Sequence, residues 1–443
     1  MPDDRIARLP ERVLEMAMEH AEAAEVFYVE ASNTPVRFEA NRLKGIDANE
    51  SAGMALRIIK DGRFGFSSTS NLEDPRLLVN AALETAPFGA QAKFTFPGPA
   101  VFPDVPVYNP SVNDLTLDRL VTLGESLVKN IRAVSHEVSV EGTVSRGISR
   151  IALVNSNGGR MRYAKSGFGA GFEGTVIRGE DMLFVHEGKS VVGAALDGGE
   201  IVSSIRRQLE WAKEIAPIDT GTMPVIFLAS AVASVLLFPL LAGFNGRSVL
   251  QGTSPMVGKL GQRIVDPRFT LIDDATLPNV PSSRPADDEG VPSRRLPLID
   301  HGFAANFYYD LQTAGLAGVS STGSGERDLG SLPSPGTGVL IVEEGDAALE
   351  AMIRDIGDGL IVEGLLGAGQ SNILGGDFNA NVSLGYRIRG GRVVGRVKNA
   401  MVTGNAYRAL NDIIAVGSES RWRGGGLRTP AIACAGIAVS AKE

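Results

Sequence analysis

The stretch Met223–Gly246 constrains the fold more than any other part of the sequence. It has no charged residue and reaches the roughly 20 apolar residues that cross a bilayer. Pro224 and Pro239 interrupt it, however, and it lacks the flanking basic cluster that orients a membrane span. These features favour a short buried strand at 224–227 and a helix at 231–241 that is apolar on every side. We therefore expect no membrane span.

Length, charge and cysteine content narrow the class of protein. A single core rarely serves a chain longer than about 300 residues, so 443 residues predict two domains. The net charge of −8, with scattered Lys and Arg, argues against direct binding of nucleic acid. A single cysteine, Cys434, cannot form an intramolecular disulfide, and the acidic, amphipathic N-terminal sequence does not resemble a secretion signal. We expect a cytoplasmic protein with a buried thiol.

The first half of the sequence repeats one pattern, in which strands lie between two helices. One copy spans about residues 8–90, with short strands such as 25–30 and 36–40, and the other spans about 115–215. Between them lies a connector at 87–110 that is too rich in proline for a helix or a central strand. The pattern predicts an N-terminal α+β domain, residues 1–216, with a duplicated antiparallel sheet and helices.

The second half, residues 224–443, reads as a β-rich domain shaped as a barrel or a sandwich. Its strands are short and its turns contain glycine, as in the Gly390-Gly391 hairpin. A short helix is predicted at 349–356. The Ser-, Gly- and Pro-rich segment 320–338 is predicted to be a loop, and a loop of that length is usually functional or forms a partner surface.

One charged segment, 283–295 (SRPADDEGVPSRR), could carry chemistry. In an extended strand Asp287 and Glu289 would face one way and Asp288 the other, which offers two metal ligands or an acid/base pair. The other interpretation is a network of ion pairs that fixes a loop, and we favour it because such networks also perturb carboxylates. Three arginines bracket the acids: Arg284, Arg294 and Arg295.

This segment also resembles the S-R-P-x-D-D-E-G-x-x-[ST]-R signature of the TldD/PmbA family, in its PmbA (TldE) branch. The resemblance extends over both halves, through Glu39–Gly45, Asn155–Gly158, Ser321–Gly323, Gly359–Gly367, Gly375–Phe378, Gly404-Asn405, Ile413–Gly417 and Leu427–Pro430. The motif positions that it marks as interface or chamber candidates are Arg284, Asp287, Asp288, Glu289, Gly290, Arg294, Ser321, Thr322, Gly323, Asp377 and Arg428.

The resemblance implies a role in a two-subunit cytosolic metalloprotease. In such a complex the TldD-type subunit holds the metal, zinc being expected, through an H-E-x-x-x-H helix and a cysteine. The TldE-type subunit has no metal site but is needed for activity. The family is associated with maturation of peptide antibiotics, with breakdown of an antitoxin and, by an older name, with modulation of DNA gyrase.

The uncharged stretch corresponds in position to the partner's metal-binding helix. Placing V-L-L-H-E-x-x-x-H on Val235–Gly243 puts Phe238 and Pro239 at the His-Glu pair and Gly243 at the second His. None of these side chains can ligate a metal or act as a base. The counterpart of the cysteine falls near Val416-Gly417. We therefore expect no catalytic residue, metal or other cofactor in this chain.

Three functions remain open on the sequence. The first is a non-catalytic subunit that binds a TldD-type partner and helps to enclose an unfolded peptide. The second is a homodimeric, non-proteolytic modulator. The third is a free-standing hydrolase that uses Asp287, Asp288 or Glu289 with a metal. None of the three includes direct binding to nucleic acid or insertion into a membrane.

Overall fold

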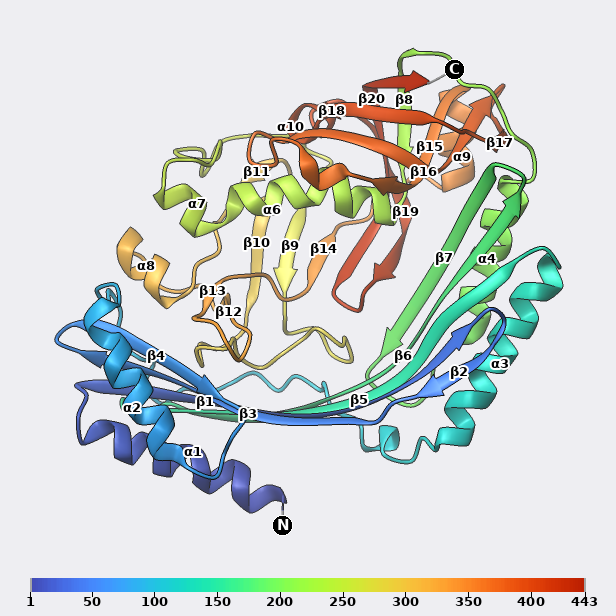
Figure 1. Cartoon of the computed structure of the whole chain (residues 1–443). Helices are drawn as coiled ribbons and strands as arrows, with labels where there is room; N and C mark the ends of the chain where they lie inside the picture. Colours follow the sequence, from blue (N-terminus) through green and yellow to red (C-terminus); the bar gives the residue numbers. More distant parts are fainter. Residues whose placement is uncertain (1, 442–443) are drawn as a thin grey trace.

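The computed structural model describes residues 2–441 and contains two large sheets that face each other (Figure 1). The N-terminal sheet has the order β4-β3-β1-β5-β6-β7, with β2 paired to β1. Its strands are β1 (Ala23–Glu39), β2 (Arg42–Ile46), β3 (Asn49–Lys60), β4 (Arg63–Thr69), β5 (Ser139–Asn155), β6 (Arg160–Arg178) and β7 (Asp181–Val191).

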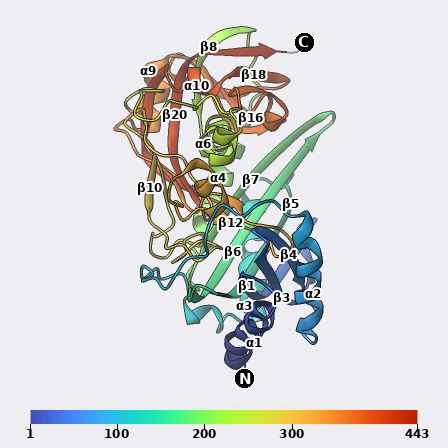
Figure 2. The same cartoon turned by 90° about the vertical axis from the view of Figure 1, so that its left-hand side faces the viewer.

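Four helices cover the outer face of this sheet: α1 (Pro2–Met18), α2 (Pro75–Thr85), α3 (Leu117–Val134) and α4 (Gly198–Trp211). Side-chain caps start three of them; the Asp74 carboxylate, for example, accepts the N–H of Arg76 at the first turn of α2. The helix–strands–helix order occurs twice, and the two runs meet where β1 pairs antiparallel with β5, from Glu25↔Asn155 to Phe38↔Gly142. The inner face is thereby left for the C-terminal part (Figure 2).

The C-terminal sheet closes on itself in part. The strands β20, β18, β16, β15 and β8 form a ring, because β8 pairs with both β15 and β20. The sheet consists of β8 (Gly221–Phe227), β9 (Leu271–Asp274), β10 (Arg295–Asp300), β11 (Phe303–Ala304), β14 (Leu340–Val342), β15 (Asp358–Leu366), β16 (Asp377–Arg389), β17 (Arg392–Arg396), β18 (Ala400–Asn405), β19 (Ile413–Arg423) and β20 (Leu427–Ala441). The α+β class and the barrel are as predicted.

Short helices and a short hairpin lie inside the barrel and around it. The helices are α5 (Ala229–Ala231), a π-helical turn (Val232–Leu237), α6 (Phe238–Phe244), α7 (Gly246–Leu250), α8 (Leu311–Ala317), α9 (Leu349–Ile356) and α10 (Ala406–Ala409). A two-residue hairpin, β12 (Gly325–Glu326) with β13 (Ser334–Pro335), lies inside the predicted loop 320–338. Single 3₁₀ turns occur at Ala86–Phe88, Pro110–Val112 and Ala368–Gln370.

The uncharged stretch forms strand β8 and then the helical run from α5 to α6. Val225 and Phe227 are buried in β8, and most of the run is buried with them in the barrel core. One departure from the prediction is Phe238, whose side chain is 48% exposed, so the run is not buried on every side. Among the described residues, no helix is long and apolar enough to cross a membrane.

Candidate functional site

The acidic segment forms a tight turn between β9 and β10, as the interpretation of a fixed loop requires, and not an extended strand. A bridge between Ala286 and Pro292 closes the turn, and Gly290 occupies the left-handed region at φ +77. Asp287 and Glu289 are both fully buried, whereas Asp288 is half-buried. The turn therefore directs two of the three carboxylates into the protein interior.

The Asp287 carboxylate holds this turn and a neighbouring loop together. Its Oδ1 accepts the backbone N–H groups of Glu289 at 3.0 Å and Val291 at 2.9 Å, and its Oδ2 accepts that of Gly325 at 2.8 Å. Burial raises the pKa of Asp287 to about 6, against the attraction of Arg284 and these N–H donors. These hydrogen bonds fix the backbone of the turn and of the neighbouring loop.

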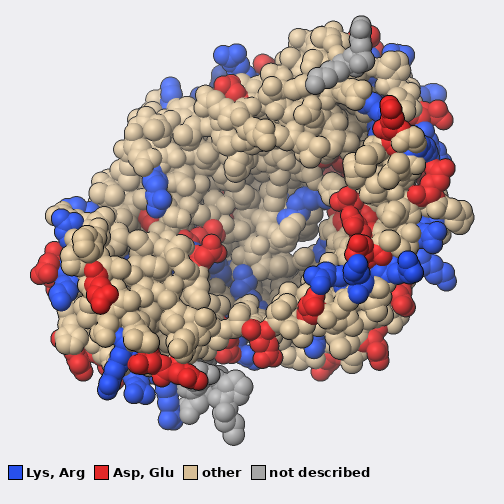
Figure 3. Space-filling model, viewed as in Figure 1, with Lys and Arg blue, Asp and Glu red and all other residues tan. Residues whose placement is uncertain are grey.

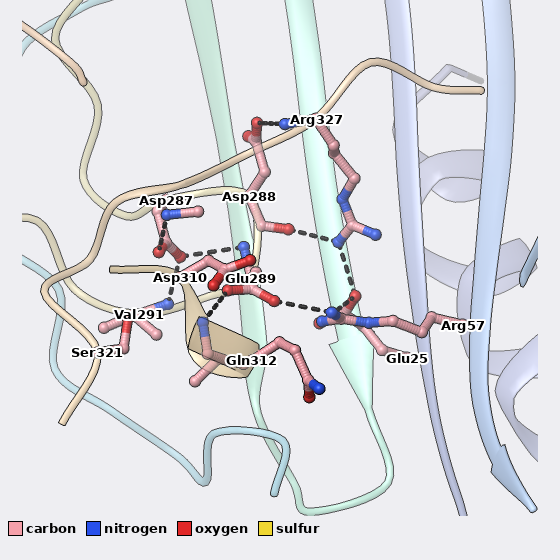
Figure 4. A network of polar contacts seen from close by, with 12 residues as sticks. Glu25, Arg57, Asp287, Asp288, Glu289, Val291, Asp310, Gln312, Ser321 and Arg327 are labelled. Carbon is pink, nitrogen blue, oxygen red and sulfur yellow. Dashed lines mark hydrogen bonds and ion pairs between the residues drawn. The ribbon is translucent and has the colours of Figure 1, made fainter. Parts of the chain in front are cut away.

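Glu289 connects the turn to the N-terminal sheet (Figure 4). Its Oε1 accepts Arg57 Nη1 at 2.8 Å, and its Oε2 accepts the backbone N–H of Leu311 at 2.6 Å. Arg57 also contacts Glu25 at 3.2 Å, and Arg327 Nη2 contacts the same Glu25 at 2.7 Å. The four buried side chains Glu25, Arg57, Glu289 and Arg327 form what we call the inter-sheet network.

The network shifts its acids in opposite directions. Burial raises the pKa of Glu289 to about 8, despite the opposing attraction of Arg57. Burial acts in the same direction on Glu25, but Arg57 and Arg327 together hold its pKa below the usual value. Glu25 is therefore the anchoring anion, and Glu289 is the weaker acid of the two.

The ion-pair interpretation is correct, but the partners differ from those that bracket the acids in sequence. Arg284 pairs with Glu326 at 3.3 Å, and Arg295 pairs with Glu343 at 3.5 Å. Arg294 donates to the carbonyl of Ser321 at 3.3 Å. Glu289 of the turn is paired instead with Arg57, and Arg327 joins the network through Glu25 and the backbone carbonyl of Asp288; sequence reasoning singled out neither arginine.

The other motif positions fall into separate places. Thr322 donates to Ser324 Oγ at 2.8 Å, and Gly323 adopts φ +75 against the Pro292 carbonyl, so both belong to the loop beside the acidic turn. Asp377 begins β16, where it accepts the Asn405 amide at 2.9 Å. Arg428 lies in β20, with its guanidinium over Trp422. Asp377 and Arg428 thus have neighbours outside the acidic turn.

The residues at the metal-helix positions do not fit a metal ion. Phe238 is half-exposed, whereas Pro239 and Gly243 are buried. A Cβ at residue 243 would clash with the hydroxyl of Tyr407, which donates to the Pro239 carbonyl at 3.3 Å. A phenolic hydroxyl therefore occupies the space beside the position aligned with the second histidine.

The position expected for the cysteine ligand offers no donor either. Gly417 pairs by backbone with Ala347, and Cys434 lies in β20 beside Val225, where burial raises the pKa of its thiol. No group of three or more His, Cys, Asp or Glu side chains suited to a metal occurs among the described residues.

A cavity of about 870 Å³ lies between the inner face of the N-terminal sheet and the β19–β20 hairpin. Ser145, Gly169 and Gly171 line one side of it, and residues 419–425 line the other. Arg423 crosses from the hairpin to Glu187 on β7, with 2.6 Å between Nη1 and Oε1. Figure 3 shows this face of the molecule hollowed between the two sheets, with Lys and Arg side chains inside the hollow.

Comparison with known proteins accounts for both halves of this architecture. Residues 220–441 match the model of the PmbA/TldA metallopeptidase C-terminal domain, and residues 24–86 match that of PmbA/TldA metallopeptidase domain 1. A metalloprotease TldD homolog of Buchnera aphidicola is 32% identical over 221 residues, which cover 47% of this chain and 45% of that protein. A metalloprotease PmbA homolog of Haemophilus influenzae is 22% identical, covering 93% of this chain and 90% of that protein.

Solved structures show the same fold over nearly the whole chain. The crystal structure of TldE from Thermococcus kodakarensis is 25% identical with a TM-score of 0.89, covering 98% of this chain and all of that one. A proposed modulator of a DNA gyrase from Thermotoga maritima is 20% identical with a TM-score of 0.86, covering 98% of this chain and 99% of that one. The resemblance of the acidic signature is thus confirmed: the chain belongs to the PmbA/TldD metallopeptidase family.

Proposed function

We propose that this chain is the metal-free, TldE-type subunit of a metallopeptidase complex and acts with a TldD-type subunit that carries the metal. The observation that carries the proposal is the helical run Val235–Gly243, where Phe238, Pro239 and Gly243 stand at the ligand and base positions. The Tyr407 hydroxyl beside Gly243 supports it further, because a histidine there would require this tyrosine to move.

The surface offers a place for a partner. Leu250 on α7, Leu316 on α8 and Val319 just beyond α8 are 40%, 53% and 51% exposed, and α7 packs against α8. Exposed apolar side chains on adjoining elements are typical of a protein–protein contact surface. A TldD-type subunit is the occupant that we propose, and a second copy of this chain is the competing occupant.

The cavity between the sheets is the proposed enclosure for an unfolded peptide. Its volume of about 870 Å³ is that of a substrate cleft rather than of a packing defect, and its lining combines backbone, hydroxyl and charged groups. In this arrangement the metal of the partner would supply the chemistry for hydrolysis of the peptide bond, and this chain would hold the extended peptide.

Co-purification tests the association. A tagged form of this chain should retain the TldD-type protein of the same organism, and the pair should cleave an unfolded protein such as reduced casein, with loss of activity in a chelator. Either protein alone should be inactive. Peptidase activity from this chain alone would contradict the proposal, and a stable homodimer that ignores the TldD-type protein would favour the modulator alternative.

The carboxylates of Asp287 and Glu289 are poorly suited to the third alternative. The carboxylate oxygens of Asp287 accept three backbone N–H groups. Those of Glu289 accept hydrogen bonds from the Arg57 guanidinium and from the backbone N–H of Leu311. Both side chains are fully buried, so neither reaches a substrate. Metal analysis of the purified chain provides the check, since a stoichiometric transition metal would restore this alternative.

A further inference from the structure

The inner face of β6 is almost free of side chains over one stretch. Alternate residues from Phe168 to Phe172 are buried on the helix side, so Lys165, Gly167, Gly169 and Gly171 share the opposite, inner face. A Cβ placed on Gly167 or Gly171 would have no neighbour within 4 Å. The backbone is therefore open at Gly167 and Gly171, whereas a Cβ on Gly169 between them would lie 2.9 Å from the Oγ of Ser190.

Neighbouring strands continue the same smooth surface. On β5, Ser145 pairs with Gly169 and Gly147 pairs with Gly167; on β7, Ser190 pairs with Gly169. Several of these small residues line the 870 Å³ cavity. Because small residues let another backbone approach closely, this surface, which we call the glycine floor, suits an extended chain.

A second cavity, of about 530 Å³, begins at the end of the glycine floor. Tyr163 and Lys165 of β6 line it, together with Arg284 and Arg327 from the loops of the C-terminal part. The two cavities are neighbours: Gly425 lines the first, and a Cβ on the adjacent Gly426 would lie 2.6 Å from the Oγ of Ser282, which lines the second.

Both arginines of this second cavity have an acidic partner, but some of their N–H groups lack an acceptor among the described residues. The Nε of Arg284 and both Nε and Nη1 of Arg327 are buried without a hydrogen-bond partner, and the two side chains are 8% and 0% exposed. Lys165 forms no ion pair with any described residue; burial and then the charge of Arg284 lower its pKa to about 8, against the attraction of Asp288 and Glu326. Unpaired buried donors beside repelling cations are the arrangement that an oxyanion relieves.

Three carboxylates that line this second cavity limit the negative charge of a ligand that can bind there. Glu326 is engaged with Arg284, and Asp288 Oδ2 accepts the backbone N–H of Arg327 at 3.1 Å. Asp328 stands at the exposed rim. These three carboxylates would repel a dianion such as phosphate more strongly than a single carboxylate, so the balance of charge favours a monoanion.

We propose that this cavity binds the C-terminal carboxylate of a peptide whose extended backbone lies along the glycine floor. Lys165 and Arg284 hold the carboxylate, Arg327 supplies a buried positive field, and the Tyr163 hydroxyl is available as a further donor. The distance along the strand from Lys165 to Gly171 is six residue steps, about 20 Å, which matches roughly six residues of an extended peptide. The inference rests on the proposed function for its ligand class, but it does not require the partner subunit.

Calorimetric titration of the full chain, without a partner, tests the proposal. The probe is an N-acetylated hexapeptide of alanine and serine with a free C-terminus. Its C-terminal amide should bind roughly tenfold more weakly or not at all, because a charge-assisted contact is lost. Equal binding of acid and amide, or no binding of the acid at millimolar concentration, would overturn the proposal. So would inorganic phosphate that binds more tightly than the peptide and displaces it.

Two variants test separately the contact with the peptide carboxylate and the contact of the peptide backbone with the glycine floor. Lys165→Gln removes a cation that has no ion pair among the described residues, so the variant should fold normally. It should weaken binding of the peptide with a free C-terminus roughly tenfold and leave binding of the C-terminal amide unchanged. Gly167→Val places a side chain in open space and should weaken the hexapeptide while acetylalanine binds as before. Lys129→Gln, which lines a different cavity, is the matched control. Unchanged affinity in both test variants would overturn the assignment.

The pH dependence gives an independent readout. Because the pKa of Lys165 is lowered to about 8, affinity for the acid peptide should fall as pH rises through 8. Binding at pH 8 should also take up protons, which titrations in buffers of different ionisation enthalpy detect. Affinity that stays constant from pH 7 to 9 would contradict the role of Lys165.

Discussion

Arg57 in β3 donates a hydrogen bond of 2.8 Å to Glu289, which lies 232 residues later in the chain. The guanidinium also contacts Glu25, its direct partner in the register of β1 and β3. One arginine thus joins an acid of the N-terminal sheet to an acid in the turn between β9 and β10, in the protein interior. Its loss would leave Glu289 without its cation and Glu25 with Arg327 alone.

Replacing Arg57 by methionine should therefore lower the stability strongly. Arg57 is one of the two cations that hold the buried Glu25 anion, and removing one partner of a buried ion pair typically costs about 3–5 kcal/mol, because the remaining charge stays buried. The midpoint of urea unfolding, followed by circular dichroism, measures the effect. Arg37→Gln is the matched control, since Arg37 and Asp47 are 58% and 46% exposed and such pairs contribute less than about 1 kcal/mol. Equal midpoints in the two variants would refute a structural role for the network.

Stability should also fall as the pH rises from about 5 to about 8. Burial raises the pKa of Glu289 from 4.5 to about 8, so in this window the folded chain keeps a proton that the unfolded chain releases. Raising the pH therefore favours unfolding, and the loss levels off above pH 8. Asp287 acts in the same direction up to about pH 6, whereas Glu25, whose pKa is lowered, acts below the window.

Glu289→Gln should flatten this dependence, because glutamine stays neutral at every pH. Urea midpoints at pH 5, 6.5 and 8 for the wild type and the variant give the comparison. Glu137→Gln, at an exposed carboxyl, should keep the wild-type slope. A variant with glutamine at 289 that still loses stability over this range would show that another group is responsible.

Gly243→Ala should destabilise the helical run despite the higher helix propensity of alanine. The new methyl group would clash with the Tyr407 hydroxyl, and overpacking of this kind costs about 1–3 kcal/mol. In a Tyr407→Phe background the hydroxyl is absent, so the same change should be neutral or stabilising by up to about 1 kcal/mol. The coupling between the two substitutions in thermal unfolding is the measurement, and additive effects would argue against the contact.

Arg423→Gln should loosen the hairpin that borders the larger cavity. The Arg423–Glu187 pair is 16% and 11% exposed, and Glu187 also accepts Ser204 Oγ at 2.8 Å, so its loss should cost about 1–3 kcal/mol locally. Hydrogen exchange should become faster in residues 419–427 and stay unchanged in β1. Arg178→Gln, which removes an exposed pair with Glu137, should change neither segment.

The sequence pattern predicted a helix or strand correctly where the pairing of strands in the sheet favoured the same conformation. The helix at 349–356 and the Gly390-Gly391 hairpin occur where the sequence placed them. The strands expected at 25–30 and 36–40, by contrast, form one continuous strand, β1. Residues 31–35 are polar and end in proline, yet they pair with β5, and in part with β3, so tertiary pairing overrides their weak strand propensity.

The acidic turn was visible in the sequence, but its partners were not. Arg57 and Glu25 lie far away in the chain, and no local spacing relates them to Glu289. The available signal was a single charge inside each of two apolar strands, at Arg57 in GMALRII and Glu25 in AEVFYV. A charge at a buried strand position requires a partner, so these two residues could have been matched to each other but not to a loop 232 residues away.

The long separation within the inter-sheet network has a consequence for synthesis on the ribosome. All seven strands of the N-terminal sheet are complete before Glu289 and Arg327 leave the ribosome. Until then Glu25 and Arg57 are the only charged members of the network that exist, and the connector, through residues such as Phe94 and Phe102, covers only part of the inner face of the sheet. The nascent chain must therefore pass through a stage in which the N-terminal sheet is complete but Glu289 and Arg327 are still missing from the network. At this stage chaperones and proteases have the greatest access to the sheet.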